Sequence, residues 1–363
     1  MIESYILQLW YPDSGAKVNF INFIIFILKP LELVYKFIIR ARIYLYKKQI
    51  FKTYRLSKPV IIIGNITVGG TGKTMVVQAL AQLLLNHGYR PGVILRGYGS
   101  NNKAPLLINS ETTASECGDE GKLIYNNLQC PVVVCKKRIL AAEYLVKNNL
   151  CDIVIADDGL QHYELGRDIE ICIVDNNRGF GNNKLLPLGP LREEKDRLNR
   201  VDYCLYKGSQ DKNGFSILGG NILDEIFNLD NKKIDLALDF FKNKVVYLLS
   251  GIGNNNSFID LVLGSELINS GAVCRDRVVI KTYPDHYGYR LSDLDFSEDD
   301  SDSIIITTEK DAVKLKELTK LAEFKNKNVY YIKTSAQLPD EFCNSLIHKI
   351  NNLLKEKNKI YVR

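Results

Sequence analysis

The chain has 363 residues, of which 46% are hydrophobic and 25% charged, and its net charge is +6. This composition excludes large-scale disorder, and the length is sufficient for two domains. The eight cysteines form no C-x-x-C pair and the four histidines show no zinc-ligand spacing, so we expect reduced thiols in a reducing compartment.

The N-terminal part combines a short apolar run with a basic stretch. The uninterrupted run at residues 23–28 is far below the ~20 apolar residues that span a bilayer, and no signal-peptide cleavage site follows it. Residues 33–58 then contain eight basic side chains and no acidic one. We predict that residues 1–58 form a helical segment that associates with a membrane surface. A pair of helices packed on the core is the alternative, whereas nucleic acid binding would leave the apolar face unexplained.

Residues 60–75 predict a phosphate-binding loop. Four branched apolar residues at 60–63 are typical of a buried strand, and an apolar helix is expected over 76–85. The turn between them would place backbone N–H groups around phosphate oxygens; it consists of Thr67, Val68, Gly69, Gly70, Thr71, Gly72, Lys73 and Thr74. Lys73 would reach the β- and γ-phosphates of a nucleoside triphosphate, and Thr74 would bind Mg²⁺. Thr67 stands where the strict pattern has glycine, and a tight turn without a ligand is the alternative.

Short apolar strands and helices alternate after this loop. Strands are expected at residues 91–95, 132–135, 152–156 and 170–174, which predicts a doubly wound, mostly parallel α/β sheet of the P-loop NTPase type. A polar connector and a second, smaller α/β domain follow. The predicted ranges are 1–58 for the membrane-associating segment, 59–206 for the P-loop domain, 207–243 for the connector and 244–363 for the C-terminal domain.

Asp157 and Asp158 end the predicted strand at 152–156. The carboxyl ends of parallel strands face the ligand crevice, and P-loop enzymes hold their Mg²⁺-directed carboxylate at this place. Gln161 and His162 would add polar side chains to the same edge. Aspartates that merely cap a turn are the alternative.

Two further positions could carry chemistry. Asp119 and Glu120 begin a predicted helix, where acidic residues are common, but a carboxylate there could also take a proton from an acceptor hydroxyl or from water. Arg192 lies in a stretch rich in glycine, proline and apolar residues, and its guanidinium would bind the phosphate of a phosphorylated or lipid-like acceptor.

Taken in order, these motifs resemble those of the tetraacyldisaccharide 4′-kinases, the lipid A kinases of Gram-negative bacteria. The resemblance runs from about residue 15 to about residue 320. The shared motifs are the loop at 67–74, Arg-Gly-Tyr-Gly at 96–99, Gly-Asp-Glu at 118–120, Asp-Asp-Gly-Leu-Gln-His at 157–162, Arg-Gly-Phe-Gly-Asn at 178–182, Gly-Pro-Leu-Arg-Glu at 189–193, Gly-Ile-Gly at 251–253, Pro-Asp-His at 284–286 and Thr-Glu-Lys-Asp-Ala at 308–312.

The resemblance implies transfer of the γ-phosphate of ATP, with Mg²⁺, to the 4′-hydroxyl of tetraacyldisaccharide 1-phosphate. It implies a peripheral, monotopic protein at the cytoplasmic face of the bacterial inner membrane, with a lipid disaccharide of that leaflet as substrate and with neither nucleic acid nor an obligate protein partner. Asp119 would be the general base, with His286 as its partner from the second domain, so that domain closure would assemble the pair. The other implied roles are catalysis by Lys73, metal binding by Thr74, Asp157 and Asp158, nucleotide binding by Gln161, and substrate binding by Arg96, Tyr98, His162 and Arg192.

A membrane-associated regulatory ATPase with a deviant Walker A loop is the alternative function. Such proteins place a signature lysine just before the glycine pair, where this chain has Val68. A non-catalytic lipid-binding adaptor is a further alternative, and the presence of Lys73, Thr74 and Asp119 argues against it. The chain departs from the kinase pattern at Met75 and Glu194, where proline is common in the family, and these departures concern loop stiffness rather than reacting groups.

Overall fold

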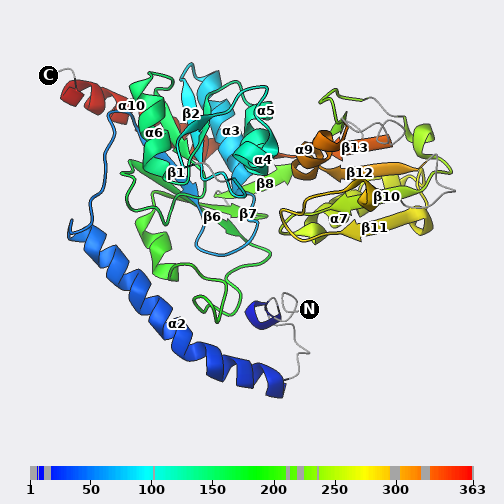
Figure 1. Ribbon diagram of the computed structural model, residues 1–363, viewed down its shortest axis with the longest axis horizontal. Coiled ribbons are helices and arrows are strands. Elements are labelled where there is room, and N and C mark those ends of the chain that lie inside the picture. The colour runs from blue at the N-terminus through cyan, green and yellow to red at the C-terminus, as the bar shows by residue number, and fades with distance from the viewer. Residues whose placement is uncertain are drawn as a thin grey trace. The chain divides into compact units, whose positions relative to one another are not determined.

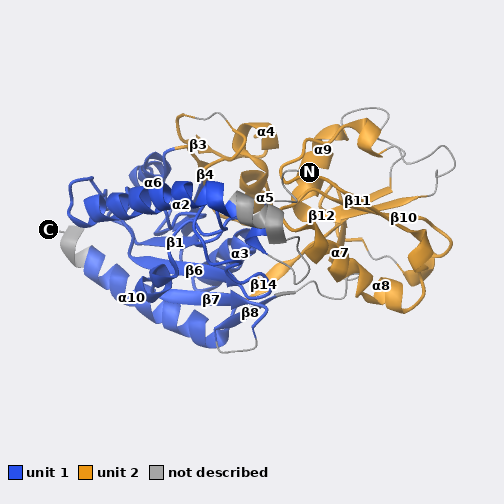
Figure 2. Cartoon of the chain, turned by 90° about the horizontal axis from the view of Figure 1, so that it is seen from below, with its two compact units in different colours: residues 1–95, 137–216, 338–363 blue, residues 96–136, 217–337 orange. Residues whose placement is uncertain are grey.

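The computed structural model describes residues 6, 8–11, 18–100, 103–209, 213–218, 225–234, 237–294, 303–319 and 328–361. These residues belong to two compact units (Figure 2). Unit 1 contains residues 1–95, 137–216 and 338–363, and unit 2 contains residues 96–136 and 217–337. All eight cysteines are free thiols and five of them are buried, in agreement with the expected reduced state.

Unit 1 is built on a sheet of parallel strands (Figure 1). Its strand order is β8-β7-β6-β1-β5-β2, so β5 lies between β1 and the earlier strand β2, and β6, β7 and β8 then extend the sheet on the other side of β1. The strands are β1 (Val60–Gly64), β2 (Pro91–Leu95), β5 (Ile153–Ala156), β6 (Ile169–Asp175), β7 (Tyr203–Lys207) and β8 (Gly214–Leu218). Every residue of β1, β2, β5 and β6 is buried, as the apolar sequences of β1, β2 and β5 require, and β6 also buries Glu170 and Asp175.

The helices of unit 1 are α2 (Val18–Lys47), α3 (Lys73–Asn86), α6 (Arg138–Lys147), the 3₁₀ helix η1 (Lys195–Arg200) and α10 (Asp340–Tyr361). In α2, apolar side chains at helical spacing are exposed, among them Phe26, Val34 and Phe37. Residues 1–5, 7 and 12–17 and the side chains of residues 18–24, which belong to the predicted membrane-associating segment, lie outside the described part of the chain. Within the described residues, no helix has the length and apolar character needed to cross a bilayer.

Unit 2 contains a second sheet, with the strand order β11-β10-β12-β13-β9. Its strands β10 (Val246–Ser250), β11 (Val278–Thr282), β12 (Ile304–Thr308) and β13 (Asn328–Ile332) are parallel, and β9 (Ile226–Asn228) is antiparallel at one edge. Alternate residues of the central strands enter two separate core clusters, one around Leu248 and Phe241 and one around Leu249 and Leu315.

Unit 2 also contains helices and strands outside this five-stranded sheet. The helices are α4 (Ala114–Cys117), α5 (Asp119–Asn127), α7 (Asn255–Leu263), α8 (Glu266–Asn269), α9 (Glu309–Leu318) and the 3₁₀ helices η3 (Leu238–Phe241), η4 (Arg275–Arg277) and η5 (Leu291–Leu294). The strands are β3 (Leu106–Leu107) and β4 (Val132–Val134), which pair antiparallel, and β14 (Ser335–Gln337).

The two units cross the predicted domain boundaries at 206 and 243. Residues 96–136 belong to unit 2 because α5 packs on α9, and Asn127 donates a hydrogen bond to Glu309 at 2.9 Å. Residues 338–363 belong to unit 1, where Lys357 of α10 forms an ion pair with Asp168 at 2.8 Å. The predicted fold class, α/β with a large, mostly parallel sheet, is confirmed, whereas the membrane association of the N-terminal helix remains a prediction.

Candidate functional site

The phosphate-binding loop lies in unit 1 between β1 and α3. Gly69 and Gly72 have φ angles of 110° and 84°, in the left-handed region that only glycine adopts at little cost, and Gly72 is the N-cap of α3. Lys73 therefore begins the helix, with Thr74 in its first turn. This is the strand–loop–helix arrangement that the sequence predicts, with the N-terminus of a helix at the loop.

A second segment braces this loop. The amide of Val68 donates to the carbonyl of Pro190 at 2.8 Å, and the amide of Arg192 donates to the carbonyl of Ile66 at 2.7 Å. A side chain at Gly69 would meet the guanidinium of Arg178, since an added Cβ would lie 2.9 Å from its Nη1. The motif around Arg178 thus lies against the loop, and this arginine is a candidate nucleotide contact that the sequence analysis did not single out, although it stands in a shared motif.

The base of the loop is held by two amide side chains. Asn65 is fully buried, and its Nδ2 donates to the hydroxyls of Thr67 at 3.4 Å and Thr71 at 3.2 Å. Gln161 Nε2 donates to the carbonyl of Asn65 at 3.2 Å. Gln161 therefore lies beside the loop, as predicted, and contacts its entry rather than its tip.

Asp158 is the centre of a charged cluster at the end of β5. Its two carboxylate oxygens each accept from Arg192 Nη1 at 2.9 Å, and Lys73 Nζ lies 3.5 Å from Oδ1. Burial raises the pKa of Asp158, but the positive charges of Lys73 and Arg192 outweigh this and lower it to about 2. Asp158 also has a φ of 47°, an uncommon conformation for a residue with a side chain.

Asp157 and Thr74 are the remaining predicted Mg²⁺ ligands. Asp157 is 3% exposed, and the guanidinium of Arg138 donates to its backbone carbonyl at 3.2 Å. Within the part of the chain that the structure describes, no three His, Cys, Asp or Glu side chains are grouped closely enough to hold a metal ion by themselves. Mg²⁺ usually binds through one or two carboxylates together with substrate phosphates, so a buried carboxylate at the end of β5, in the unit that carries the phosphate-binding loop, fits this ion.

Helix α2 contacts the segment that carries Arg192. The hydroxyl of Tyr35 donates to the carbonyl of Arg192 at 3.1 Å. Arg40 binds both carboxylate oxygens of Glu194 at 2.8 and 2.9 Å, and Lys36 lies 2.9 Å from the same group. Two of the basic residues that the sequence assigned to a membrane surface therefore pair with a carboxylate of their own unit.

Asp119 and His286 meet within unit 2, although 166 residues separate them in the chain. His286 Nδ1 lies 3.1 Å from Asp119 Oδ2, and the Tyr98 ring packs 4.7 Å from the His286 ring. Gly118, with a φ of 82°, allows the start of α5 to lie close to the backbone of Tyr98, because a Cβ at this position would lie 2.6 Å from the carbonyl oxygen of Tyr98. The family resemblance predicted this pair between two domains, but both residues belong to one compact unit.

Asp119 is a mostly buried carboxylate at the N-terminus of α5. Burial raises its pKa, but the hydrogen bond from His286 and the charge of Lys314, 3.6 Å away, make the net shift downward. Asp119 is therefore ionised at neutral pH and can accept a proton.

The other predicted substrate contacts are distributed over both units. Arg96 and Tyr98 are exposed in unit 2, whereas His162 and Arg192 are partly buried in unit 1. His162 lies at the turn after Asp158, and its carbonyl accepts a hydrogen bond from Arg167. The contacts bring Lys73 and Arg192 to Asp158 in unit 1, and they bring His286, with the Tyr98 ring beside it, to Asp119 in unit 2.

Comparisons with known proteins agree with these motifs. Residues 24–351 match the model of the family described as LpxK: Tetraacyldisaccharide-1-P 4′-kinase. The chain is 40% identical over 332 residues to the tetraacyldisaccharide 4′-kinase of Coxiella burnetii (strain RSA 331 / Henzerling II), covering 91% of this chain and 93% of the relative. It is 37% identical over 357 residues to that of Shewanella sediminis, covering 96% and 99%.

A solved structure is similar as well. It is the crystal structure of LpxK from Aquifex aeolicus in complex with ATP, with a TM-score of 0.71 and 28% sequence identity. The similarity covers 90% of this chain and 98% of that chain. The shared fold therefore extends over both units of the present structure.

Proposed function

The chain belongs to the tetraacyldisaccharide-1-P 4′-kinase family, and we propose that its two groups of polar residues carry out the family's reaction. The chain is an ATP-dependent kinase of lipid A biosynthesis, which transfers the γ-phosphate of ATP to the 4′-hydroxyl of tetraacyldisaccharide 1-phosphate. The observation that supports the proposed residue roles best is the pairing of Asp119 with His286 at 3.1 Å in a partly buried place.

In unit 1, the loop amides and Lys73 bind and neutralise the phosphates of ATP. Phosphoryl transfer requires mainly positioning and charge compensation, which these fixed groups supply without rearranging at the moment of reaction. Thr74 and Asp157 would hold Mg²⁺, with Asp158 beside them, and the ion supplies further positive charge to the phosphate oxygens when bound. Arg192, fixed on Asp158 at 2.9 Å, is placed beside these groups, and its predicted contact with the disaccharide remains a proposal.

In unit 2, Asp119 accepts the proton of the acceptor hydroxyl as that oxygen attacks the γ-phosphate. His286 donates to one carboxylate oxygen and thereby leaves the other one for the substrate. Tyr98, whose ring packs on the His286 ring, and Arg96, an exposed residue of the same motif, are proposed to contact the disaccharide. Because His286 already contacts Asp119 within the unit, no domain movement is needed to form the pair.

The membrane association and location are also proposals. The exposed apolar stripe of α2 favours insertion into the surface of one leaflet, at the cytoplasmic face of the inner membrane, where a lipid disaccharide would be met. Neither nucleic acid nor an obligate protein partner is required. The double substitution Phe26→Glu and Phe37→Glu should abolish flotation with anionic vesicles, whereas Ile280→Glu, at an exposed apolar site of unit 2, should leave it unchanged. Equal flotation of both variants would contradict the role of α2.

The kinase is tested with purified protein, ATP, Mg²⁺ and tetraacyldisaccharide 1-phosphate in detergent. Phosphate should appear on the lipid, and Lys73→Ala should abolish its transfer. ATP turnover without phosphorylated lipid would instead support the regulatory ATPase with a deviant Walker A loop. The lipid product is therefore the decisive measurement.

A further inference from the structure

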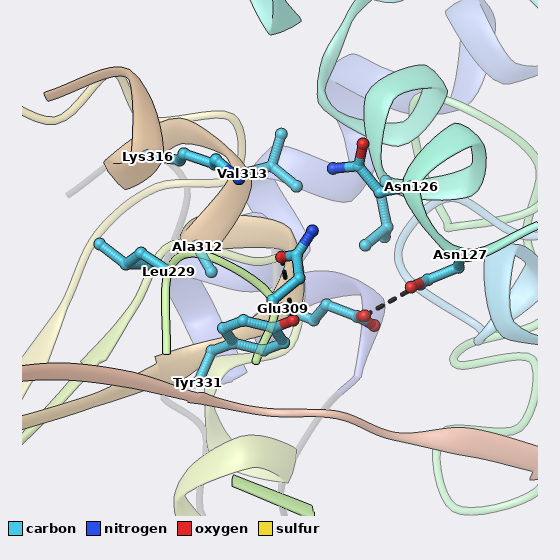
Figure 3. A pocket seen from close by; sticks show the side chains of 10 residues that line it. Asn126, Asn127, Leu229, Glu309, Ala312, Val313, Lys316 and Tyr331 are labelled. Atoms are coloured by element: carbon cyan, nitrogen blue, oxygen red, sulfur yellow. Dashed lines mark hydrogen bonds between the residues drawn. The ribbon is translucent and has the colours of Figure 1, made fainter. Parts of the chain in front are cut away.

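Helix α9 carries two lysines that the proposed function does not use, and its packing fixes where they point. At one end Asn127 of α5 donates to Glu309 (Figure 3), and at the other end the amide of Ala114 donates to Glu317 at 2.9 Å. The pocket between these helices measures about 10 Å³, room for one water molecule at most. Because Ala114 begins α4, helix α9 is held against both α4 and α5, and it presents Lys310 and Lys314 toward the start of α5.

Lys314 lies between two carboxylates. Its side chain is only 9% exposed, and its Nζ is 3.1 Å from Asp311 and 3.6 Å from Asp119. Asp311 is fully buried and is itself fixed, because its Oδ2 accepts from the amide of Gly251 at 2.9 Å and from the hydroxyl of Thr308 at 2.7 Å. An ammonium group held in this way stays opposite Asp119 instead of turning into solvent.

Lys310 contacts the other side of the Asp119–His286 pair. Its Nζ lies 3.0 Å from Asp285, 3.6 Å from Glu120 and 3.5 Å from Nε2 of His286. An ammonium group has only donors, so the contact with Nε2 requires a lone pair on that nitrogen. The ring proton of neutral His286 must then be on Nδ1, which faces Asp119.

We propose that Lys310 and Lys314 are positioning residues of the kinase reaction: Lys310 fixes the tautomer of His286, and Lys314 compensates the charge of Asp119. This inference rests on the proposed role of Asp119 as the base. With the proton on Nδ1, His286 donates to Asp119 and cannot take its place as the proton acceptor through that nitrogen. Asp119 Oδ1 is then the atom that accepts the hydroxyl proton.

In the opposite tautomer the ring proton of His286 is on Nε2, and Asp285 is a group that could accept a hydrogen bond from it. Asp285 Oδ2 lies 3.8 Å from Nε2 and could accept a proton from it, but Asp285 is closer to Lys310. Among the residues that the structure describes, the charged groups around the pair are the acids Glu120, Asp285 and Asp311 and the cations Lys310 and Lys314. Removing Lys310 therefore leaves Asp285 available as an acceptor for Nε2–H.

The tautomer can be measured directly, because the chain has only four histidines. We suggest ¹⁵N NMR of the full chain labelled at histidine, with the His286 signals assigned by their loss in His286→Gln. The unmodified protein should show a protonated Nδ1 and an unprotonated Nε2. Lys310→Met should shift the signals toward protonated Nε2, and Lys310→Arg, which retains a donor, should preserve the original pattern. A protonated Nε2 in the unmodified protein, or no change in Lys310→Met, would overturn the role of Lys310.

The role of Lys314 is tested by the pH profile of kcat/KM for lipid phosphorylation. Opposite charges at this distance lower a carboxyl pKa by about 1 unit or more, so Lys314→Met should move the acidic limb upward by about one pH unit. Lys314→Arg should restore the limb, and Lys316→Met, a control on the same helix, should not move it. A fall in rate that is equal at every pH would reduce Lys314 to a structural role and contradict the proposal.

The activity assay and the lysine variants distinguish a wrong base from wrong roles of the two lysines. If the unmodified protein transfers no phosphate to the lipid, the proposed residue roles fail, whatever the NMR signals show. If it is active and Asp119→Ala is not, but the tautomer and the acidic limb do not respond to the lysine variants, the base assignment stands and only the present inference is refuted.

Discussion

Asp158→Asn isolates the stabilising effect of the charged cluster at the end of β5. The substitution keeps the shape of the side chain and removes the charge that Lys73 and Arg192 surround. The pKa of Asp158 is lowered from 3.8 to about 2, and one pKa unit corresponds to about 1.36 kcal/mol, so the full shift is equivalent to about 2.4 kcal/mol. Because the side chain is 36% exposed, solvent screens part of this, and we expect a loss of about 1 to 1.5 kcal/mol at pH 7.

The sign of the pH dependence follows from the direction of the shift. A carboxyl whose pKa is lower in the folded state stabilises fully above its ordinary pKa, and this stabilisation disappears as the pH falls from about 4 to about 2. The difference between Asp158→Asn and the unmodified protein should therefore be constant from pH 7 to about 5 and shrink below about 4.

Thermal unfolding without nucleotide is the suitable assay. One kcal/mol shifts the Tm of a unit of this size by roughly 2–4 °C, so we expect Asp158→Asn to lower it by about 3 °C at pH 7. Asp196→Asn, at an exposed position of η1, is the matched control and should change the Tm by less than about 1 °C. If the Tm of Asp158→Asn equals that of the unmodified protein at pH 7, or if the difference persists unchanged to pH 3, the cluster does not stabilise the fold as argued.

Three further predictions concern separate parts of the molecule. Asp119→Ala should lower kcat by about 10²–10⁴ while the affinity for ATP, measured by calorimetry, stays within about twofold; a nearly normal rate would remove Asp119 as the base. Phe241→Ala, at a fully buried site of unit 2, should lower the free energy of unfolding in urea by about 3–5 kcal/mol, and Asp239→Ala, at an exposed neighbouring site, should have little effect. Of the cysteines, the exposed Cys274 should react first with a thiol reagent, whereas Cys151 and Cys172, whose pKa burial raises to about 12, should react only on unfolding; early loss of those two thiols would contradict their burial.

The local features of the site could be predicted from the sequence because they depend on short segments. The loop from Thr67 to Thr74 follows from a strand, a glycine-rich turn and a helix in that order, and the two aspartates follow from the end of an apolar strand. The pairing of Asp119 with His286 rested on the family resemblance, and the structure brings the two residues together. Composition or spacing alone would not have selected His286.

Contacts between residues far apart in the chain could not be predicted from the sequence in this way. Residues 96–136 join unit 2 through contacts such as Asn127 with Glu309, 182 residues apart, which leave no local signal. The same holds for Lys36 and Arg40: a basic run next to apolar residues predicts a membrane surface, but Glu194, far along the chain, is the partner that the fold supplies. Charge patterns in a sequence identify available groups, and the fold decides which of them meet.

The position of α10 has a consequence for how the protein is made. This helix, at residues 340–361, belongs to the same unit as the phosphate-binding loop, and Tyr89 and Asp168 of that unit form hydrogen bonds with its Asn351 and Lys357. During synthesis on the ribosome, all of residues 217–337 must emerge before these contacts can form. The nucleotide-binding unit therefore cannot finish folding first, as N-terminal domains commonly do, and a truncation before residue 340 would expose apolar surface of a nearly complete unit to chaperones and proteases.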